Sequence, residues 1–197
     1  MIARKSALIM ATAIIETALA YAALFFIARY MGPRDYGIIG FAMGFVGLFS
    51  FLSSLGFSEA HIKRISEGKD LGTCIGTFLV TKLGLVSLMA SATVGAVFFW
   101  KFVIGRGFES STHEIAIYII LGYFILERIS TIFQDTYTAE TKIAKVRIPI
   151  FISTVARTGA IIFVAVSGFG PIILAFAYVF GHLFLFITSL LLFRKML

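Results

Sequence analysis

Six long runs of apolar residues, separated by short polar connections, dominate this chain of 197 residues. Each run is close to the roughly 20 residues that an α-helix needs to cross a bilayer. The runs are apolar on all sides, whereas the strands of a membrane barrel alternate at every second residue. We therefore predict an all-α integral membrane protein, with one six-helix transmembrane domain over residues 1–197. The predicted spans are Ala7–Ala28, Gly37–Phe57, Gly76–Trp100, Ile115–Phe133, Ile148–Val166 and Pro171–Phe193.

The composition excludes other classes of protein. Apolar residues make up 59% of the chain and charged residues 14%, against about 45–50% and about 25% in soluble domains. So apolar a chain is neither a water-soluble globule nor a disordered segment. Its single cysteine, Cys74, can supply neither an internal disulfide nor a metal cluster. We expect no metal and no cofactor.

The first apolar run has two interpretations. Arg4 and Lys5 precede it, and Ala18-Leu19-Ala20 has the form of a signal-peptide cleavage site. However, the run continues to Ala28, and Glu16 interrupts what would be the hydrophobic region of a leader. These features favour a spanning helix over a cleaved leader.

The cations are distributed unevenly between the two ends of the predicted spans. One end has ten and the other has four, which places both termini in the cytoplasm by the positive-inside rule. The net charge of +7 is then mainly a topology signal in a cytoplasmic membrane, and it requires no nucleic-acid partner. The ten are Arg4, Lys5, Lys63, Arg64, Lys69, Lys142, Lys145, Arg147, Arg194 and Lys195, and the four are Arg29, Arg34, Lys101 and Arg106.

Glycines at positions 37, 40, 44 and 47 share one face of the second predicted helix. This face is either a flat packing surface or a surface along which another helix slides during transport. The two long inner connections, 58–70 and 134–147, are either solvated loops or short helices lying along anionic headgroups.

Ionisable residues inside the spans are the strongest indication of function, because a charge in hydrocarbon costs roughly 2.5–3.5 kcal/mol on insertion scales. Lys82 and Glu127 lie at similar depths on consecutive helices, and we predict a structural ion pair between them, with snorkelling of Lys82 as the alternative. The residues of this kind are Glu16, Lys82, Glu127, Arg128, Arg157 and His182.

Arg157 lies near the middle of its span, where snorkelling is hardest, and its planar guanidinium suits phosphate oxygens. We predict that it faces a cavity and binds an anion; the alternative is a structural pair with Glu16. Arg128 points about 100° away from Glu127 around the helix. His182 is either a hydrogen-bonded packing residue or a proton relay. No catalytic triad, metal cluster or phosphate loop is found, so we do not expect an enzyme.

Two segments resemble the polysaccharide-biosynthesis flippases, the Wzx-type members of the multidrug/oligosaccharidyl-lipid/polysaccharide exporter superfamily. The first is the turn ARYMGPRDYG at residues 28–37, and the second is LGFSEA at residues 55–60, followed by Lys63-Arg64-Ile65. The six-helix layout agrees over essentially the whole chain. The resemblance implies one helical lobe of a flippase that moves a lipid-linked oligosaccharide across the membrane for polysaccharide or glycoprotein synthesis.

The resemblance also implies partners. Such flippases have 12 or 14 helices in two lobes around a cationic cavity, so we expect a second six-helix lobe, either another copy or a missing C-terminal half. Membrane lipids and a lipid-linked sugar (pyro)phosphate are the other expected partners. From charge and depth, the candidate substrate-binding residues are Arg157, Arg128, Arg29 and Glu16, and Glu16 and His182 are candidates for coupling.

Two other functions stay open. The first is half of a multidrug exporter, in which Glu16 binds an organic cation or a coupling ion. The second is a membrane scaffold subunit without transport activity, whose buried charges serve only packing.

Overall fold

The computed structural model describes residues 2–105 and 107–194, with side chains from residue 7 onward. Four of the cations used to predict the orientation lie outside that description, wholly for Arg106 and Lys195 and in their side chains for Arg4 and Lys5. The described residues contain no strand. The helices are α1 (Ile2–Tyr30), α2 (Gly32–Gly47), η1 (Ser50–Ser53), α3 (Phe57–Ser66), α4 (Leu71–Phe98), η2 (Phe99–Val103), α5 (Ser111–Ala139), α6 (Ile143–Val166) and α7 (Pro171–Arg194).

Five helices are long and apolar enough to cross a membrane. They are α1, α4 with its continuation η2, α5, α6 and α7. A sixth crossing is possible if α2 and the segment 50–66, which meet at a bend of 53°, form one broken span. The prediction of an all-helical membrane protein is thus confirmed.

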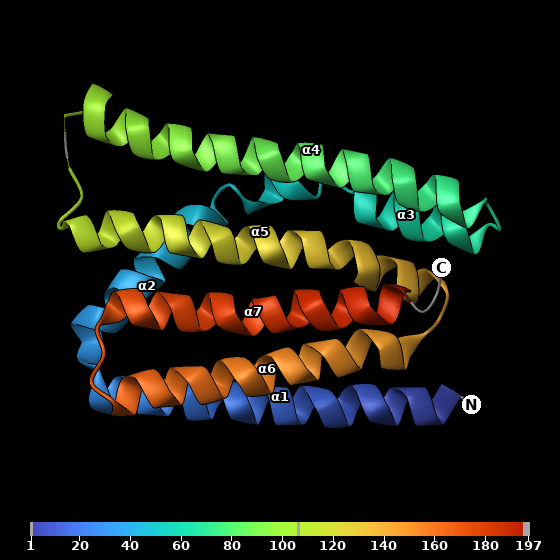
Figure 1. Cartoon of the computed structure of the whole chain (residues 1–197), viewed down its shortest axis with the longest axis horizontal. Helices are drawn as coiled ribbons and strands as arrows, with labels where there is room; N and C mark the ends of the chain where they lie inside the picture. The colour runs from blue at the N-terminus through green and yellow to red at the C-terminus, as the bar shows by residue number, and fades with distance from the viewer. Residues whose placement is uncertain (1, 106, 195–197) are drawn as a thin grey trace.

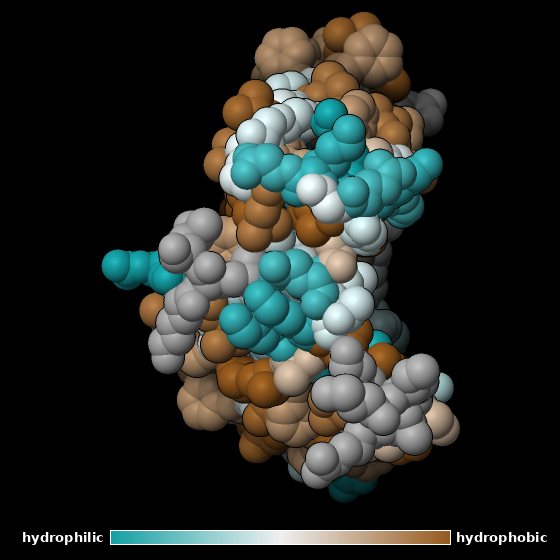
Figure 2. Space-filling model, turned by 90° about the vertical axis from the view of Figure 1, so that its right-hand side faces the viewer, coloured by the Kyte–Doolittle hydropathy of each residue, from teal (hydrophilic) through white to brown (hydrophobic). Residues whose placement is uncertain are grey.

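The helices form a slab (Figure 1). Along one face, α4, α5, α7, α6 and α1 follow one another, and α2 and α3 lie behind them. The close packing of α6 on α7, α5 on α7 and α1 on α6 holds the slab together. The chain begins and ends on the same side of it, and Figure 2 looks at that end, where hydrophilic side chains gather between apolar ones. Which side of the membrane this end occupies stays a prediction.

The second predicted helix, 37–57, is not continuous. It stops at Gly47, a short 3-10 helix follows, and α3 begins at Phe57. The Ser53 hydroxyl donates to the Ser50 carbonyl at 2.6 Å, and Leu55 and Gly56 take left-handed conformations with φ of 44° and 78°. Ser50, Ser53, Ser54 and Gly56 favour a break in the helix at this point. The residues around them are apolar enough that hydropathy alone predicts one continuous span.

The inner connection at 58–70 contains a helix, α3, and not only a loop. One side of α3 is buried, with His61 4% exposed, and the other side carries Lys63, whose side chain is 77% exposed. Helix α3 packs against both α4 and α5.

The four-glycine face of α2 does not pack within this chain. The buried residues of α2 are Ile38, Ile39, Ala42 and Val46, which lie on another face. A Cβ added at any of the four glycines would meet no atom within 4 Å beyond the helix itself. Within the described residues, the face therefore has no partner helix.

Candidate functional site

A polar cluster surrounds Arg157 in the middle of the slab. Arg157 lies on α6 and is half-buried. Its guanidinium is within hydrogen-bonding reach of the Tyr123 hydroxyl on α5, and its charge acts on Tyr178 and His182 of α7. None of the ion pairs within 4 Å in the described part of the chain includes Arg157. The group is thus an intramembrane cation without a paired carboxylate.

Arg157 faces a cavity of about 260 Å³. The wall from α1 is entirely apolar, and it includes Ala23 and Ile27. The polar part of the wall comes from Arg157, Tyr36 of α2 and Tyr178 of α7, with Thr158 beside them. One fixed positive charge and two phenol groups therefore converge on a space that holds about eight water molecules.

Close contact between α6 and α7 positions Arg157. Gly181 of α7 lies directly against the first carbons of the Arg157 side chain, so a Cβ at position 181 would overlap Arg157 Cβ and lie 3.0 Å from its Cα. Beside this contact, the Ser153 hydroxyl donates to the Gly181 carbonyl at 2.7 Å. The absence of a side chain at Gly181 thus allows the two helices to approach at the depth of the cavity.

His182 follows Gly181 and is 6% exposed. Its ring packs on Tyr123 with the centroids 4.2 Å apart, and its buried Nδ1 has no hydrogen-bond partner. The ring also interacts with the backbone of Tyr178 one helical turn earlier, which is the arrangement of a packing residue. The choice between packing residue and proton relay stays open.

Arg128 lies beside this cluster and does not line the cavity. Its Nε is 3.7 Å from the Glu127 Oε2 on the same helix, and that Nε is buried without a hydrogen bond. The charges of Glu127, Arg128 and Arg157 all act on Tyr123. Arg128 therefore contributes positive potential near the cavity but is partly neutralised by its neighbour.

Arg29 and Glu16 lie elsewhere. Arg29 is exposed near the end of α1, with its guanidinium 5.9 Å from the ring of Tyr30. Glu16 lies 3.8 Å from Arg147 near the start of α6, ten residues before Arg157. The alternative pairing of Glu16 with Arg157 does not form, because α1 and α6 pack in a register that places Glu16 opposite Arg147.

The structure also gives Lys82 and Glu127 partners other than each other. The Lys82 side chain reaches α3, where Nζ donates to Ser58 Oγ at 3.4 Å, while Glu127 lies next to Arg128. The predicted ion pair between them is absent from those within 4 Å in the residues described. Lys82 does not snorkel either, since it is 1% exposed. The docking of α3 over this part of α4 keeps it buried.

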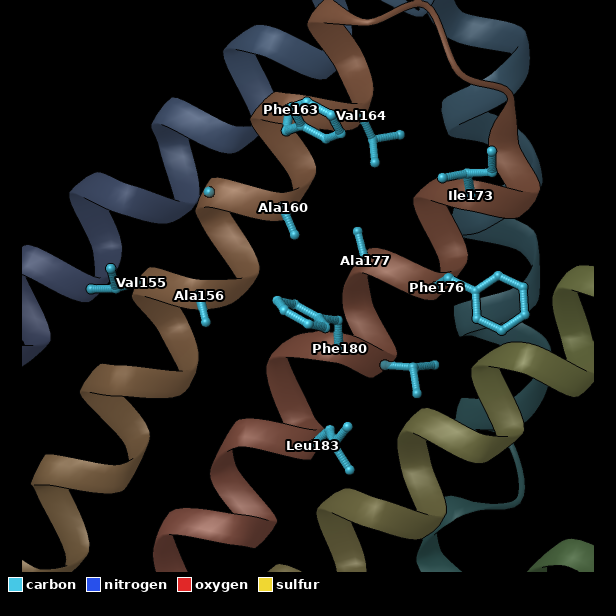
Figure 3. A pocket seen from close by; sticks show the side chains of 12 residues that line it. Val155, Ala156, Ala160, Phe163, Val164, Ile173, Phe176, Ala177, Phe180 and Leu183 are labelled. Carbon is cyan, nitrogen blue, oxygen red and sulfur yellow. The ribbon is translucent and has the colours of Figure 1, made fainter.

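A larger groove of about 710 Å³ lies between α6 and α7 (Figure 3). Its wall is formed by apolar residues such as Ala160, Phe163, Ala177 and Phe180, and it includes no polar side chain. Arg157 and Thr158, which line the smaller cavity, do not line this groove, although Ala160 lies only about 60° from Arg157 around α6. Of these two sites, the Arg157 cavity and not the apolar groove has groups that can bind an anion.

Sequence reasoning missed the tyrosines of the cluster. None of Tyr36, Tyr123 and Tyr178 is among the site residues predicted from the sequence. Tyr123 precedes Glu127 by one helical turn and Tyr178 precedes His182 by one turn, so each tyrosine shares a face with an intramembrane ionisable residue. This one-turn spacing is the sequence feature from which Tyr123 and Tyr178 could have been predicted as members of the site.

One family, described as "Polysaccharide biosynthesis protein", matches residues 2–197 of the chain. No curated protein and no solved structure matches it.

Proposed function

Because the chain belongs to the polysaccharide biosynthesis protein family of Wzx-type flippases, we propose that it moves a lipid-linked oligosaccharide across the cytoplasmic membrane. Membership supports a transport role in general. The cargo is our inference from the Arg157 cavity. The lipid-linked (pyro)phosphate is the anionic part of such a cargo, and it is the part that a buried guanidinium would recognise.

The observation that carries this proposal is the unpaired charge of Arg157 beside a cavity. Intramembrane charges usually pair or line a substrate path, and Arg157 has no carboxylate within 4 Å among the described residues. Arginine stays ionised and offers parallel N–H donors to phosphate oxygens. The hydroxyls of Tyr36 and Tyr178 would add donors from α2 and α7.

The size of the cavity limits what it can hold. About 260 Å³ accommodates a phosphate-sized group and not an oligosaccharide. The sugar and the lipid tail would therefore extend out of this lobe, which fits a passage shared with a second lobe. The exposed four-glycine face of α2, the helix that also carries Tyr36, supports the same arrangement. The partner lobe, as a second copy or a further half, is part of the proposal.

We assign secondary roles to the other candidates. Arg128 would raise the positive potential near the cavity, and Arg29 would meet the anion at one end of the path. His182, whose ring lies near Arg157, would couple cargo release to loss of a proton, because departure of the anion leaves the charge of Arg157 to disfavour a charged imidazole. Glu16 is engaged by Arg147, so we assign it to coupling through that ion pair rather than to direct contact with cargo.

A binding assay tests the proposal without requiring the second lobe. Purified protein in nanodiscs is titrated with undecaprenyl pyrophosphate and, separately, with the cationic dye rhodamine 6G. We expect the pyrophosphate to bind and Arg157→Ala to weaken it about 10- to 100-fold, the value of a charge-assisted hydrogen bond. Arg157→Lys keeps the charge but loses the planar guanidinium, so we expect it to weaken binding less than Arg157→Ala does.

Arg34→Ala is the matched control, because Arg34 is an exposed arginine outside the cavity. The affinity of Arg34→Ala for undecaprenyl pyrophosphate should equal that of the unmodified protein. Binding of the dye in place of the pyrophosphate would support the multidrug exporter. Binding of neither, with Arg157→Ala affecting only folding, would support the scaffold and overturn the proposal.

A further inference from the structure

A second group of buried polar side chains lies where α3 docks on α4 and α5, away from the Arg157 cavity. Lys82 of α4 donates to the Ser58 hydroxyl at the start of α3 with Nζ to Oγ of 3.4 Å. The same hydroxyl interacts with the carboxylate of Asp135 on α5. We call Lys82, Ser58 and Asp135 the Ser58 bridge, because one hydroxyl stands between a buried cation and an anion.

The Ser58 bridge leaves hydrogen-bonding capacity unused. An ammonium has three donors, and at Lys82 the structure shows one long hydrogen bond and a contact 5.6 Å above the Phe78 ring. On the other side, Asp135 Oδ2 is buried and has no hydrogen-bond partner. Buried charges are costly unless each has an opposite charge and satisfied hydrogen bonds. Asp135 thus has a free oxygen at which a proton can bind.

We propose that Asp135 is a proton-binding site whose occupancy determines whether α3 stays docked on α4 and α5. With Asp135 ionised, the Ser58 bridge holds α3 because Lys82 has its opposite charge nearby. A proton on Asp135 removes that charge and leaves the ammonium of Lys82 uncompensated in a dry site. Lifting α3 relieves this by letting water reach Lys82. This inference does not depend on the cargo proposed above.

Other charged groups near the Ser58 bridge influence the charge states of Lys82 and Asp135. From α3, Glu59 acts on both Asp135 and Lys82, and from α5, Glu127 and Arg128 act on Lys82 with opposite signs. Two further titratable groups of α3 face α4: Arg64 lines the pocket beside Cys74, and the Nε2 of His61 lies 3.0 Å from Thr136 Oγ1. The Thr136 hydroxyl already donates to the Ile132 carbonyl, so His61 is the donor in this contact. Asp135 is then the carboxylate that faces Lys82 through Ser58.

The backbone before α3 is shaped for such movement. Helix α3 follows the break in the second span, where Leu55 is a non-glycine residue with φ of 44° and Gly56 has φ of 78°. Strained conformations of this kind concentrate at segments that switch between positions. Movement of α3 would therefore change the angle of a broken span without unfolding α2.

The chain contains its own reporter for this movement. Cys74 is its single cysteine, it is 6% exposed, and it lines a pocket of about 160 Å³ between α3 and α4 together with His61 and Phe78. A thiol reagent gains access to Cys74 when α3 lifts. The rate of labelling by N-ethylmaleimide therefore measures undocking without any introduced label.

The first experiment compares labelling rates at pH 7 in the purified chain of 197 residues. We expect Asp135→Asn, which mimics the protonated carboxyl, to label at least tenfold faster than the unmodified protein. Adding Lys82→Met to Asp135→Asn removes the uncompensated charge and should return the rate towards the starting value. Glu140→Gln is the matched control: this carboxylate lies at the end of α5 and pairs with Lys142 at 2.8 Å, so its neutralisation should change the rate less than twofold.

The second experiment tests the proton itself. The ratio of the Asp135→Asn rate to the unmodified rate is measured from pH 8 to pH 5, so that the intrinsic pH dependence of the thiol cancels. We expect the ratio to fall towards 1 as Asp135 gains its proton. If Asp135→Asn does not fold, Ser58→Ala removes the bridging hydroxyl and carries the same expectation. A ratio that stays constant with pH, or a Glu140→Gln rate as high as that of Asp135→Asn, would overturn the inference.

Discussion

Substituting Gly181 by alanine tests whether the contact between α6 and α7 holds Arg157 in place. The added Cβ would overlap Arg157 Cβ and lie 3.0 Å from both Cα and Cγ of that residue, so the helices must separate. Separation also stretches the 2.7 Å hydrogen bond from Ser153 to the Gly181 carbonyl. Overpacking costs about 1–3 kcal/mol, and an interhelical hydrogen bond of this kind contributes about 0.6 kcal/mol in membrane proteins.

The matched control is Gly159→Ala on α6. Gly159 is exposed, and a Cβ there meets no atom within 4 Å, so this change should be neutral or stabilise the helix by about 0.5–1 kcal/mol. Compared with this control, Gly181→Ala loses about 1.6–3.6 kcal/mol, which for a chain of this length corresponds to a Tm about 3–14 °C lower. Thermal unfolding in detergent, followed by size-exclusion chromatography, measures the difference.

A second readout is the affinity for undecaprenyl pyrophosphate. Displacement of Arg157 by Gly181→Ala should weaken binding, whereas Gly159→Ala should not. Equal unfolding temperatures for the two variants would refute the reasoning, since the helices would then accommodate a methyl group at Gly181 without cost.

Three further predictions concern the ends of the helices. Gly56→Ala forces a side chain into a left-handed conformation with φ of 78°, so we expect a loss of about 1–2 kcal/mol in unfolding free energy; unchanged thermal unfolding would contradict it. The hydroxyl of Thr73 and, at 2.8 Å, its backbone N–H donate to Asp70, and these bonds at the start of α4 hold the pKa of Asp70 below its ordinary value of 3.8. Because the folded pKa is the lower one, the stabilisation is complete above pH 3.8 and is lost as the pH falls through the folded pKa; an Asp70→Ala variant should therefore lose its stability deficit in acid, as thermal melts against pH would show. Lys101 lies 3.0 Å from Glu114, with side chains 43% and 24% exposed, so Lys101→Met should cost at most about 1 kcal/mol at low salt and less at high salt; a salt-independent loss in chemical unfolding would contradict it.

The sequence was sufficient to predict the class of fold. Apolar runs of membrane-spanning length identify α1, α4, α5, α6 and α7, because a helix in lipid must be apolar on every face. The resemblance carried by the turn at 28–37 and the segment 55–60 led to the family that the chain belongs to. Both signals lie within short stretches of sequence, so they can be recognised without knowledge of the three-dimensional structure.

The partners of the buried charges could not be predicted in the same way. Depth along a helix suggested Lys82 with Glu127 and Glu16 with Arg157, whereas the structure places Lys82 against Ser58 and Glu16 against Arg147. Depth gives one coordinate of a side chain, but pairing also depends on rotation about the helix axis and on which helices are neighbours. The break at Gly47, which brings α3 over Lys82, had no counterpart in the hydropathy pattern.

The packing of α1 on α6 has a consequence for biosynthesis. The two helices are separated by about 110 residues of chain, and α1 makes fewer contacts with its successor α2 than with α6. At synthesis rates of about 5–20 residues per second, α1 enters the bilayer roughly 6–22 s before its main partner exists. In a nascent chain of this protein, lipid or an insertase must therefore cover the surface of α1 until α6 has been synthesised and inserted.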